Sequence, residues 1–268
     1  MNVREVVEIV LKLNGGRKFE KTCDQLIEGD WDYEVAGVAT TFMATVDVIR
    51  RAIDMGHNLI ITHEPTYFTG WDNIDWVKDD PVYQRKKALI DDNRISIWRY
   101  HDHMHSGHED LIYAGLLKEL GWENYLDTSL PQPHCYAVPP TTVSALVGFF
   151  KKALGMKVIQ VVGDPEMKCS RVGILVGGGS LGLGREEMPA RLMHDERLDV
   201  MVCGEITEWT LSAYVRDAVA LGFNKAMIVV GHERSEEPGM KDLADRLQPL
   251  LGDIPVRFSD SGEPFIYL

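Results

Sequence analysis

Histidine and acidic side chains occur together at three separated points of the sequence, each at or just after the end of a predicted strand. The pairs His63-Glu64 and His232-Glu233 follow two apolar runs, and a short strand at residues 95–100 leads into His-Asp-His-Met-His at residues 101–105. Imidazole nitrogens and carboxylate oxygens are ligands that divalent transition metals accept in proteins. A single histidine at a strand end is more often a capping or solvated residue than a ligand. Three such segments that converge in the folded chain instead favour a metal site.

The spacing inside these segments leads to two expectations. If residues 101–105 are extended, side chains alternate between faces, so the three histidines point one way and Asp102 the other, and all three could not easily bind one ion. His232 and Glu236 are four residues apart, so a helix that begins near residue 235 would let both face the preceding strand end. An acidic side chain such as Glu236 is favoured at a helix start, and a carboxylate that bridges two ions is an equally reasonable role.

A glycine-rich stretch at residues 177–184 formally matches the Gly-x-Gly-x-x-Gly pattern of dinucleotide-binding proteins. The acidic residue at the expected offset, Asp199, precedes a strand, whereas a ribose ligand would lie at the far end of one, which disfavours a dinucleotide site. Two interpretations stay open: the backbone N–H groups cradle an anion at a helix start, or the stretch is only a tight turn.

Two further groups of residues could line the same cleft. Glu205 and Glu208 follow another apolar run, although solvated acids or helix-start residues are the commoner case. The aromatic residues after Glu64 could form the wall of a substrate pocket, but a local core or an oligomer contact is as common, and packing is favoured; they are Tyr67, Phe68, Trp71 and Trp76.

A scaffold of alternating strands and helices must position these side chains. Apolar runs rich in Val and Ile alternate with segments of helical period, which predicts an α/β protein, and ligands in such folds collect at the carboxyl ends of strands. Ser106 and Glu109 form a capping-box pattern that predicts a helix through Leu120. The other expected helices are 3–13, 44–55, 81–91, 143–154, 186–194, 209–221 and one ending at 251; the expected strands are 33–41, 58–62, 95–100, 158–162, 171–176, 200–203, 226–230 and one at the end of the chain.

The division of the chain is predicted from its prolines. Pro131, Pro133, Pro139 and Pro140 cluster in a polar stretch at residues 128–141, which indicates a boundary or crossover there. We therefore expect two α/β halves, 1–128 and 129–268. A helix, a strand and a His-Glu pair occur in this order at 44–64 and again at 209–233, which suggests an internal duplication.

Composition excludes several classes of protein. Asp and Glu number 41 against 28 Lys and Arg among 268 residues, a formal charge of −13, so a nucleic acid or an anionic membrane is not expected as a partner. The four cysteines form no Cys-x-x-Cys pair, and no signal peptide or membrane-length apolar segment is visible, so a cytoplasmic location is expected.

Several short motifs together resemble one known family. They are Thr40-Thr41 before a helix, LIITHEPTYF, the strand into HDHMH, VGILVGGGS, CGEIT and IVVGHERSE, in this order from about residue 35 to 240. In this combination the chain resembles the Nif-three-like dinuclear metal centre proteins, which are also known as the GTP cyclohydrolase 1 type 2 family, without the large central insertion of some members.

The resemblance implies two intertwined α/β halves with mixed sheets, a ring-shaped homohexamer and two divalent ions per subunit, with the C-terminal segment completing the metal site. Family ligands come from His-His-Pro, from His-Thr-Asn-Leu-Asp and from a closing His-x-x-x-Glu. His63 and His101 keep the first histidines of their motifs, and His232 and Glu236 match the closing pair. The second histidine is replaced by Glu64 and the aspartate by His105. These six residues are the expected ligands, for Zn, Mn, Fe or Ni.

The resemblance also implies a function. We expect a metal-dependent hydrolase that acts on a nucleotide or a related small molecule, with GTP ring opening suggested by the family name alone. Glu64 would serve as a ligand or as the base that activates water. The alternative is a non-enzymatic metal-binding or protein-interaction scaffold with a protein partner.

Overall fold

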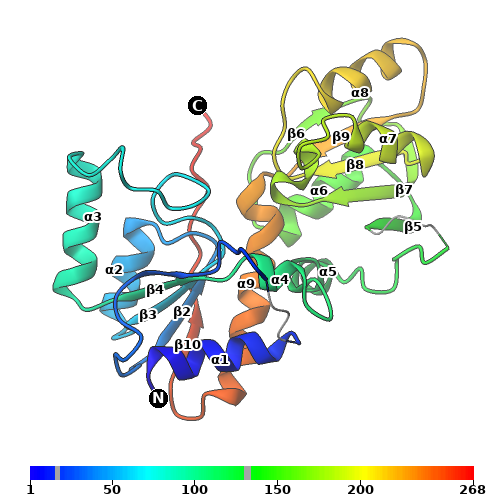
Figure 1. The fold of residues 1–268 in the computed structure, drawn as a ribbon. Helices are drawn as coiled ribbons and strands as arrows, with labels where there is room; N and C mark the ends of the chain where they lie inside the picture. Colours follow the sequence, from blue (N-terminus) through cyan, green and yellow to red (C-terminus); the bar gives the residue numbers. More distant parts are fainter. Residues whose placement is uncertain (16–18, 130–133) are drawn as a thin grey trace. The chain divides into compact units, whose positions relative to one another are not determined.

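The computed structural model describes residues 1–15, 19–129 and 134–268 and divides the chain into two compact units (Figure 1). The first contains Met1–Gly115 and Glu237–Gly262, and the second contains Leu116–Glu236 and Glu263–Leu268. Each unit has a five-stranded mixed sheet with helices, so the predicted α/β class is confirmed. The sequence-based division placed the boundary after residue 128 and kept residues 237–262 with the second half.

The sheet of the first unit has the order β1-β4-β3-β2-β10. Strands β2 (Val38–Thr41), β3 (Leu59–Thr62), β4 (Ser96–Arg99) and β10 (Val256–Phe258) are parallel, and β1 (Leu26–Glu28) pairs antiparallel with β4 at the edge. Every residue of β2, β3 and β4 is buried, as in parallel strands that are covered on both faces. Strand β1 was not predicted, because three residues are too few to show an alternating pattern.

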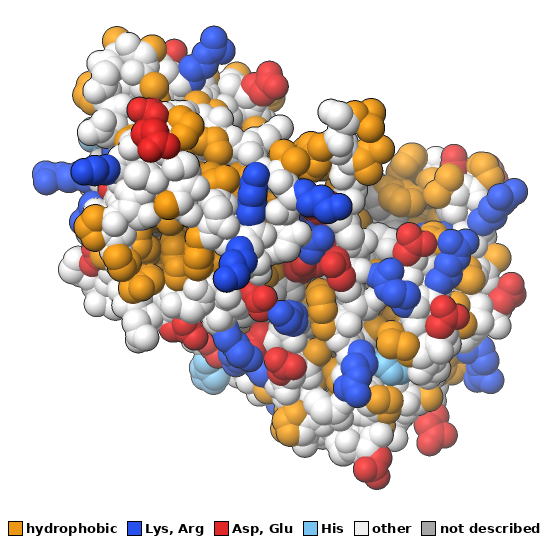
Figure 2. Space-filling view, turned by 180° about the vertical axis from the view of Figure 1, so that it is seen from behind, with side chains coloured by type: hydrophobic (Ala, Val, Ile, Leu, Met, Phe, Trp, Pro, Cys, Tyr) orange, Lys and Arg blue, Asp and Glu red, His pale blue; other side chains and the backbone are white. Residues whose placement is uncertain are grey.

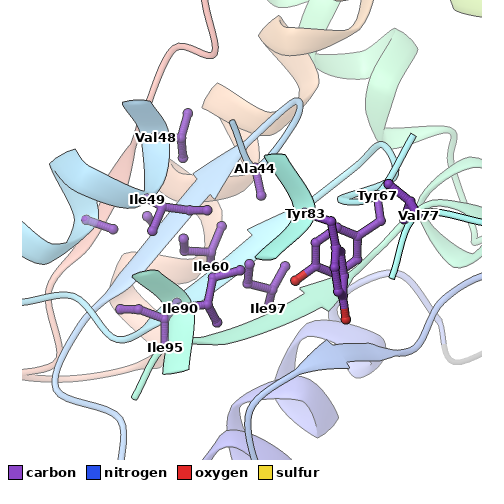
Figure 3. Close-up of a cluster of buried hydrophobic side chains, with 12 residues drawn as sticks. Ala44, Val48, Ile49, Ile60, Tyr67, Val77, Tyr83, Ile90, Ile95 and Ile97 are labelled. Carbon is purple, nitrogen blue, oxygen red and sulfur yellow. The ribbon is translucent and has the colours of Figure 1, made fainter. Parts of the chain in front are cut away.

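Helices of the first unit cover this sheet with apolar faces. They include α1 (Val3–Leu13), α2 (Val46–Asp54) and α3 (Pro81–Asp92). Helix α2 starts where the Thr45 hydroxyl accepts a hydrogen bond from the Val48 N–H at 3.2 Å. Its residues Val48 and Ile49 belong to one buried cluster with Ile60 of β3 and Ile97 of β4 (Figure 3). This core fixes the two strands that lead to the histidines.

The sheet of the second unit has the order β5-β7-β8-β9-β6. Parallel strands β7 (Lys168–Leu175), β8 (Val200–Cys203) and β9 (Ala226–Val229) lie between the antiparallel edge strands β5 (Cys135–Thr142) and β6 (Gln160–Val162). The unit also contains α6 (Val143–Ala153), the short 3-10 helix η1 (Gly177–Leu181), α7 (Met188–Asp195) and α8 (Leu211–Ala220).

Strand β5 corrects the interpretation of the proline cluster. Pro139 and Pro140 lie within this strand and not in a linker, whereas Pro131 and Pro133 lie outside the described residues. Ala137 opposes Arg171 and Thr141 opposes Cys169, so the pairing register shifts across the two prolines. Within the described residues, the outer side of β5 is bridged by Leu126 only at Tyr136, before the prolines, and an edge strand tolerates proline where no ladder hydrogen bond is required.

Two helices carry the chain from one unit to the other. Helix α5 (Leu111–Leu120) includes the change at residue 115, and α9 (His232–Leu247) includes the change at residue 236; the 3-10 helix η2 (Gln248–Leu250) follows α9. Helix α9 starts at His232, three residues earlier than the sequence predicts.

The surface carries charges of both signs and several exposed aromatic rings. On the face shown in Figure 2, acidic and basic side chains are intermixed. Phe68, Trp71 and Trp76 are exposed by 53%, 53% and 63%, so the favoured packing role holds only for the buried Tyr67. No helix within the described ranges is long and apolar enough to cross a membrane.

The close approach of α5 and α9 inside the first unit yields a stability prediction. A Cβ atom at Gly115 would lie 2.5 Å from the Gly239 Cα and 2.6 Å from the Pro238 carbonyl oxygen, and neither backbone can move cheaply. Gly115→Ala should therefore lower the free energy of unfolding by about 1–3 kcal/mol. Gly148→Ala in α6, where a Cβ meets nothing within 4 Å, should be neutral or raise it by up to about 1 kcal/mol. Equal urea midpoints for both variants would contradict this packing argument.

Candidate metal centre

Two of the histidine-bearing segments leave neighbouring parallel strands at the same edge of the first sheet. His63 follows β3 directly, and His101 follows β4 after Tyr100. The two strands pair in register up to Thr62 and Arg99, so their carboxyl ends coincide. His63 is fully buried, and its backbone N–H donates to the Thr41 carbonyl at 3.1 Å, which fixes the chain where it leaves the sheet.

The segment after β4 is helical and not extended, so the prediction of alternating side chains is wrong. Residues Asp102–His105 form the short helix α4, and the His105 N–H donates to the His101 carbonyl at 3.1 Å. Residues four apart on a helix share a face, so His101 and His105 lie together with ring centroids 5.1 Å apart. His103 is directed elsewhere, with its Nδ1 2.7 Å from Asp24 Oδ2.

Two side chains from distant segments hold this turn in its helical form. The Asp24 carboxylate accepts hydrogen bonds from the backbone N–H groups of residues 101–103 at 2.8–3.0 Å, as a capping residue would. The amide of Asn14, at the end of α1, donates to the carbonyls of Met104 and Glu109 at 3.2 and 2.9 Å. Neither residue is close to the turn in sequence, which is why the local pattern did not predict its conformation.

Three imidazoles therefore gather at the strand ends: His63, His101 and His105, here called the imidazole triad. The rings of His63 and His101 stack with centroids 4.6 Å apart, and those of His63 and His105 are 5.1 Å apart. One nitrogen from each of the three lies within 4.8 Å of the others. Ligand atoms grouped this closely could hold one divalent ion.

Each imidazole of the triad has its Nδ1 against a protein acceptor. His63 Nδ1 lies 3.0 Å from the Tyr100 carbonyl oxygen. His101 Nδ1 lies 3.0 Å from Asp102 Oδ1, and His105 Nδ1 lies 2.9 Å from Asp110 Oδ2. A neutral imidazole that donates from Nδ1 keeps a lone pair on Nε2, and such outer partners orient the ligating histidines of metal proteins. The triad is thus arranged to offer three Nε2 atoms.

Asp110 links the triad to the next helix. Its Oδ1 accepts hydrogen bonds from the N–H groups of Ile112 and Tyr113 at 3.0 and 3.1 Å, so it caps α5 while Oδ2 holds His105. The predicted capping box of Ser106 and Glu109 is wrong, because the helix begins only at Leu111.

Burial and hydrogen bonding set the charge of one triad pair. Burial lowers the pKa of His101 to about 4, and the neighbouring His63 adds to the shift. Burial acts against ionisation of Asp102, but hydrogen bonds from His101, Thr22 and Cys23 outweigh it and bring the pKa of Asp102 to about 2. At neutral pH the pair is a neutral imidazole and a carboxylate, which is the state that binds a metal.

Cys23 offers a second grouping with His101 and Asp102, but its chemistry is poorer. Its Sγ lies 3.4 Å from Asp102 Oδ1, and the ligand atoms of the three residues lie within 4.8 Å. Burial raises the pKa of the Cys23 thiol to about 12, so the thiolate that metals require is disfavoured.

Glu64 lies between the triad and a buried arginine. Its Oε1 is 3.7 Å from His101 Nε2, and its Oε2 is 3.6 Å from Arg99 Nη2. The four expected ligands of the first unit are thus neighbours, and Asn14, Asp24, Arg99 and Asp110 are site residues that the sequence did not reveal.

The remaining expected ligands lie in the second unit, at the start of α9. His232 Nε2 is 3.0 Å from Glu236 Oε2, and His232 Nδ1 is 3.0 Å from Glu205 Oε1. Glu236 is buried. The imidazole of His232 is therefore anchored through Nδ1 as in the triad, and Glu205 has a positioning contact where the sequence favoured a solvated acid.

The first glycine of the glycine-rich stretch lies against the His232–Glu236 pair. Gly177 has φ +47°, and a Cβ there would fall on the Glu236 carboxylate and lie 2.6 Å from His232 Nε2. Its N–H donates to Ser235 Oγ at 2.9 Å. Glycine at 177 thus lets the backbone approach the His232–Glu236 pair, a role that neither sequence interpretation of this stretch included.

Comparisons with known proteins agree in pointing to one family. Residues 1–264 match the family described as Duf34/NIF3 (NGG1p interacting factor 3). The chain is 22% identical over 281 aligned positions to a Clostridium perfringens protein named GTP cyclohydrolase 1 type 2 homolog, covering 100% of the chain and 98% of that protein. A Clostridium acetobutylicum protein of the same name is 24% identical over 238 positions, covering 84% and 81%.

Solved structures show the same fold. A Bacillus cereus protein related to NIF3 superposes with a TM-score of 0.77 at 16% identity, and Staphylococcus aureus protein SA1388 does so with 0.74 at 20% identity. Both alignments cover 100% of this chain and 99% of the other.

The lowered pKa of His101 predicts how acid affects the metal-free protein. The folded chain protonates His101 near pH 4 and the unfolded chain near 6.5, so acidification through this window favours unfolding. Between pH 7 and pH 5, His101 should account for about 2 kcal/mol of lost unfolding free energy. Urea titrations in the presence of a chelator should show that His101→Gln no longer has this pH-dependent loss of unfolding free energy. The exposed control His194→Gln should retain it. The same pH dependence in both variants would disprove the assignment.

Proposed function

The chain belongs to the Duf34/NIF3 family, and we propose that it binds two divalent metal ions and is a hydrolase of a nucleotide or a related small molecule. The observation that supports this most is the imidazole triad. Three histidines from two strand ends have their Nδ1 atoms held by acceptors, and their ligand atoms lie within 4.8 Å. Structural histidines have no need of this shared orientation, whereas metal ligands do.

The residues present fit divalent ions of the transition series. The triad supplies nitrogen, and Glu64 beside it supplies carboxylate oxygen. In the second unit, His232 and Glu236 offer one further nitrogen and one further carboxylate. Mixed nitrogen and oxygen donors suit Zn, Mn, Fe or Ni. The exchanges at Glu64 and His105 keep both donor types in the set.

The reaction assigned to the site is hydrolysis. Divalent ions supply Lewis acidity and make water a competent nucleophile at neutral pH. Asp102 and Asp110 hold the imidazoles of His101 and His105 in the tautomer that binds an ion. Glu64 Oε1, the oxygen that faces away from Arg99, is the atom that would bind an ion or accept the proton of water.

The substrate class rests on the relatives. Two of them are named GTP cyclohydrolase 1 type 2 homolog, at 22% and 24% identity, which supports a purine nucleotide as the first compound to test. The net charge of −13 does not oppose this choice, because bound cations change the local field that a phosphate meets. The homohexamer, the protein partner and the cytoplasmic location stay predictions from the resemblance and the composition.

Metal content gives the first test of this function. Purified protein reconstituted at neutral pH should contain about two divalent ions per chain by elemental analysis. His101→Ala and His232→Ala should each lose bound metal and reduce the metal-dependent rise in melting temperature, because binding by remote segments contributes to folding free energy. His194→Ala, on the surface, should retain both properties. Full metal content in either ligand variant would remove that residue from the ligand set.

Turnover gives the second test. Metal-loaded protein offered GTP and other nucleotides should release product, and a chelator should abolish the reaction. Glu64→Gln should lower kcat by roughly 100-fold or more if Glu64 handles the proton, and should lower metal content instead if it is a ligand. Unchanged metal content and unchanged turnover would exclude both roles. Absence of turnover in fully loaded protein, with metal-independent capture of a protein partner, would favour the scaffold.

A further inference from the structure

Arg99 is a buried cation at the end of β4, and the hydrolytic function described above assigns it no role. Its residue is only 3% exposed. A guanidinium removed from water is costly unless acceptors surround it. Its acceptors therefore indicate what keeps a charged side chain at this position.

The contacts of Arg99 converge on the first ligand-bearing segment. Nε donates to the His63 carbonyl at 3.1 Å, and Nη1 donates to the Gly70 carbonyl at 2.6 Å. Nη2 lies 3.6 Å from Glu64 Oε2, and Nη1 lies 4.0 Å from Asp72 Oδ2. One guanidinium thus holds the backbone of His63 and the side chain of the next residue, Glu64.

The pairing separates the two oxygens of Glu64. Oε2 faces Arg99, and Oε1 faces His101 Nε2 at 3.7 Å. Glu64 has three side-chain torsions, so the carboxylate could otherwise adopt several directions at an entropic cost to metal binding. An arginine fixed by two carbonyls is a rigid partner that restricts this choice.

We propose that Arg99 is the positioning residue for Glu64, and that it aims Oε1 of the carboxylate at the ion that the imidazole triad would hold. This inference rests on the proposed metal-binding function, with Glu64 as a ligand and not only as a base. It assigns Arg99 a role specific to this chain, because Glu64 stands where the family pattern has a histidine. A lysine cannot replace Arg99, since one ammonium group cannot contact His63, Gly70 and Glu64 in the fixed directions that a planar guanidinium offers.

The test is a double-mutant cycle on metal affinity with Co²⁺ as the probe. Arg99→Lys keeps the positive charge but removes the planar guanidinium, so it should weaken Co²⁺ binding by about 10-fold to 100-fold and shift the visible absorption of the bound ion. In a Glu64→Gln background the same substitution should have little further effect, because Arg99 acts through Glu64. Arg51→Lys, at an exposed arginine whose Nε donates to Ser259 Oγ, is the control and should leave affinity unchanged.

The outcomes separate this inference from the proposed function. A parent protein that binds no Co²⁺ would overturn both. Normal Co²⁺ binding by both the parent and Arg99→Lys would overturn the inference alone. So would a loss of Co²⁺ affinity from Arg99→Lys that is as large in the Glu64→Gln background as in the parent, since that result indicates a purely structural role of Arg99 through the two carbonyls.

A second variant covers a failure of Arg99→Lys to fold. Glu64→Asp leaves Arg99 in place and shortens the carboxylate, which can then no longer span from Arg99 to the triad. Its Co²⁺ affinity should fall as in Glu64→Gln, and an unchanged affinity would overturn the inference.

Discussion

A neutral imidazole has one N–H and one lone pair, so the group that accepts its N–H decides which nitrogen is left to bind a metal. In the first unit this single constraint orders the surroundings of three histidines. The acceptor for His63 is the carbonyl of Tyr100 at the end of β4, and the acceptor for His105 is the carboxylate that caps α5. The ends of secondary-structure elements and the orientation of these imidazoles therefore depend on the same polar groups.

The sequence was sufficient where the position of a candidate ligand follows from strand order. His63 directly follows a fully buried strand, and the short strand predicted at residues 95–100 leads to His101, so the convergence of these segments could be predicted from parallel pairing alone. The conformation of residues 101–105 could not, because it depends on Asp24 and Asn14, which lie about 80 or more residues earlier in the chain. A four-residue helix has too little propensity of its own to be visible in a local pattern.

The two exchanges relative to the family pattern are matched by their surroundings. Glu64 faces Arg99, and His105 faces Asp110, so the residue at each exchanged position has a neighbour of suitable chemistry. Such partners are difficult to predict from a single sequence, since a buried arginine and a helix-capping aspartate look ordinary without the fold. The same holds for Gly177, whose lack of a side chain matters only because of what lies opposite it.

Strand β5 has a consequence for how chains meet one another. An open sheet edge presents backbone N–H and C=O groups to which a strand of another molecule can add, a common route to aggregation. Proline has no N–H to donate, and Pro139 and Pro140 stand next to each other on this edge with exposed side chains. The register shift beside them also interrupts the straight row of groups that an incoming strand would need. Leu126 already bridges to Tyr136 on the outer side of this strand, so the two prolines oppose extension by a foreign strand along the part of β5 beyond that bridge.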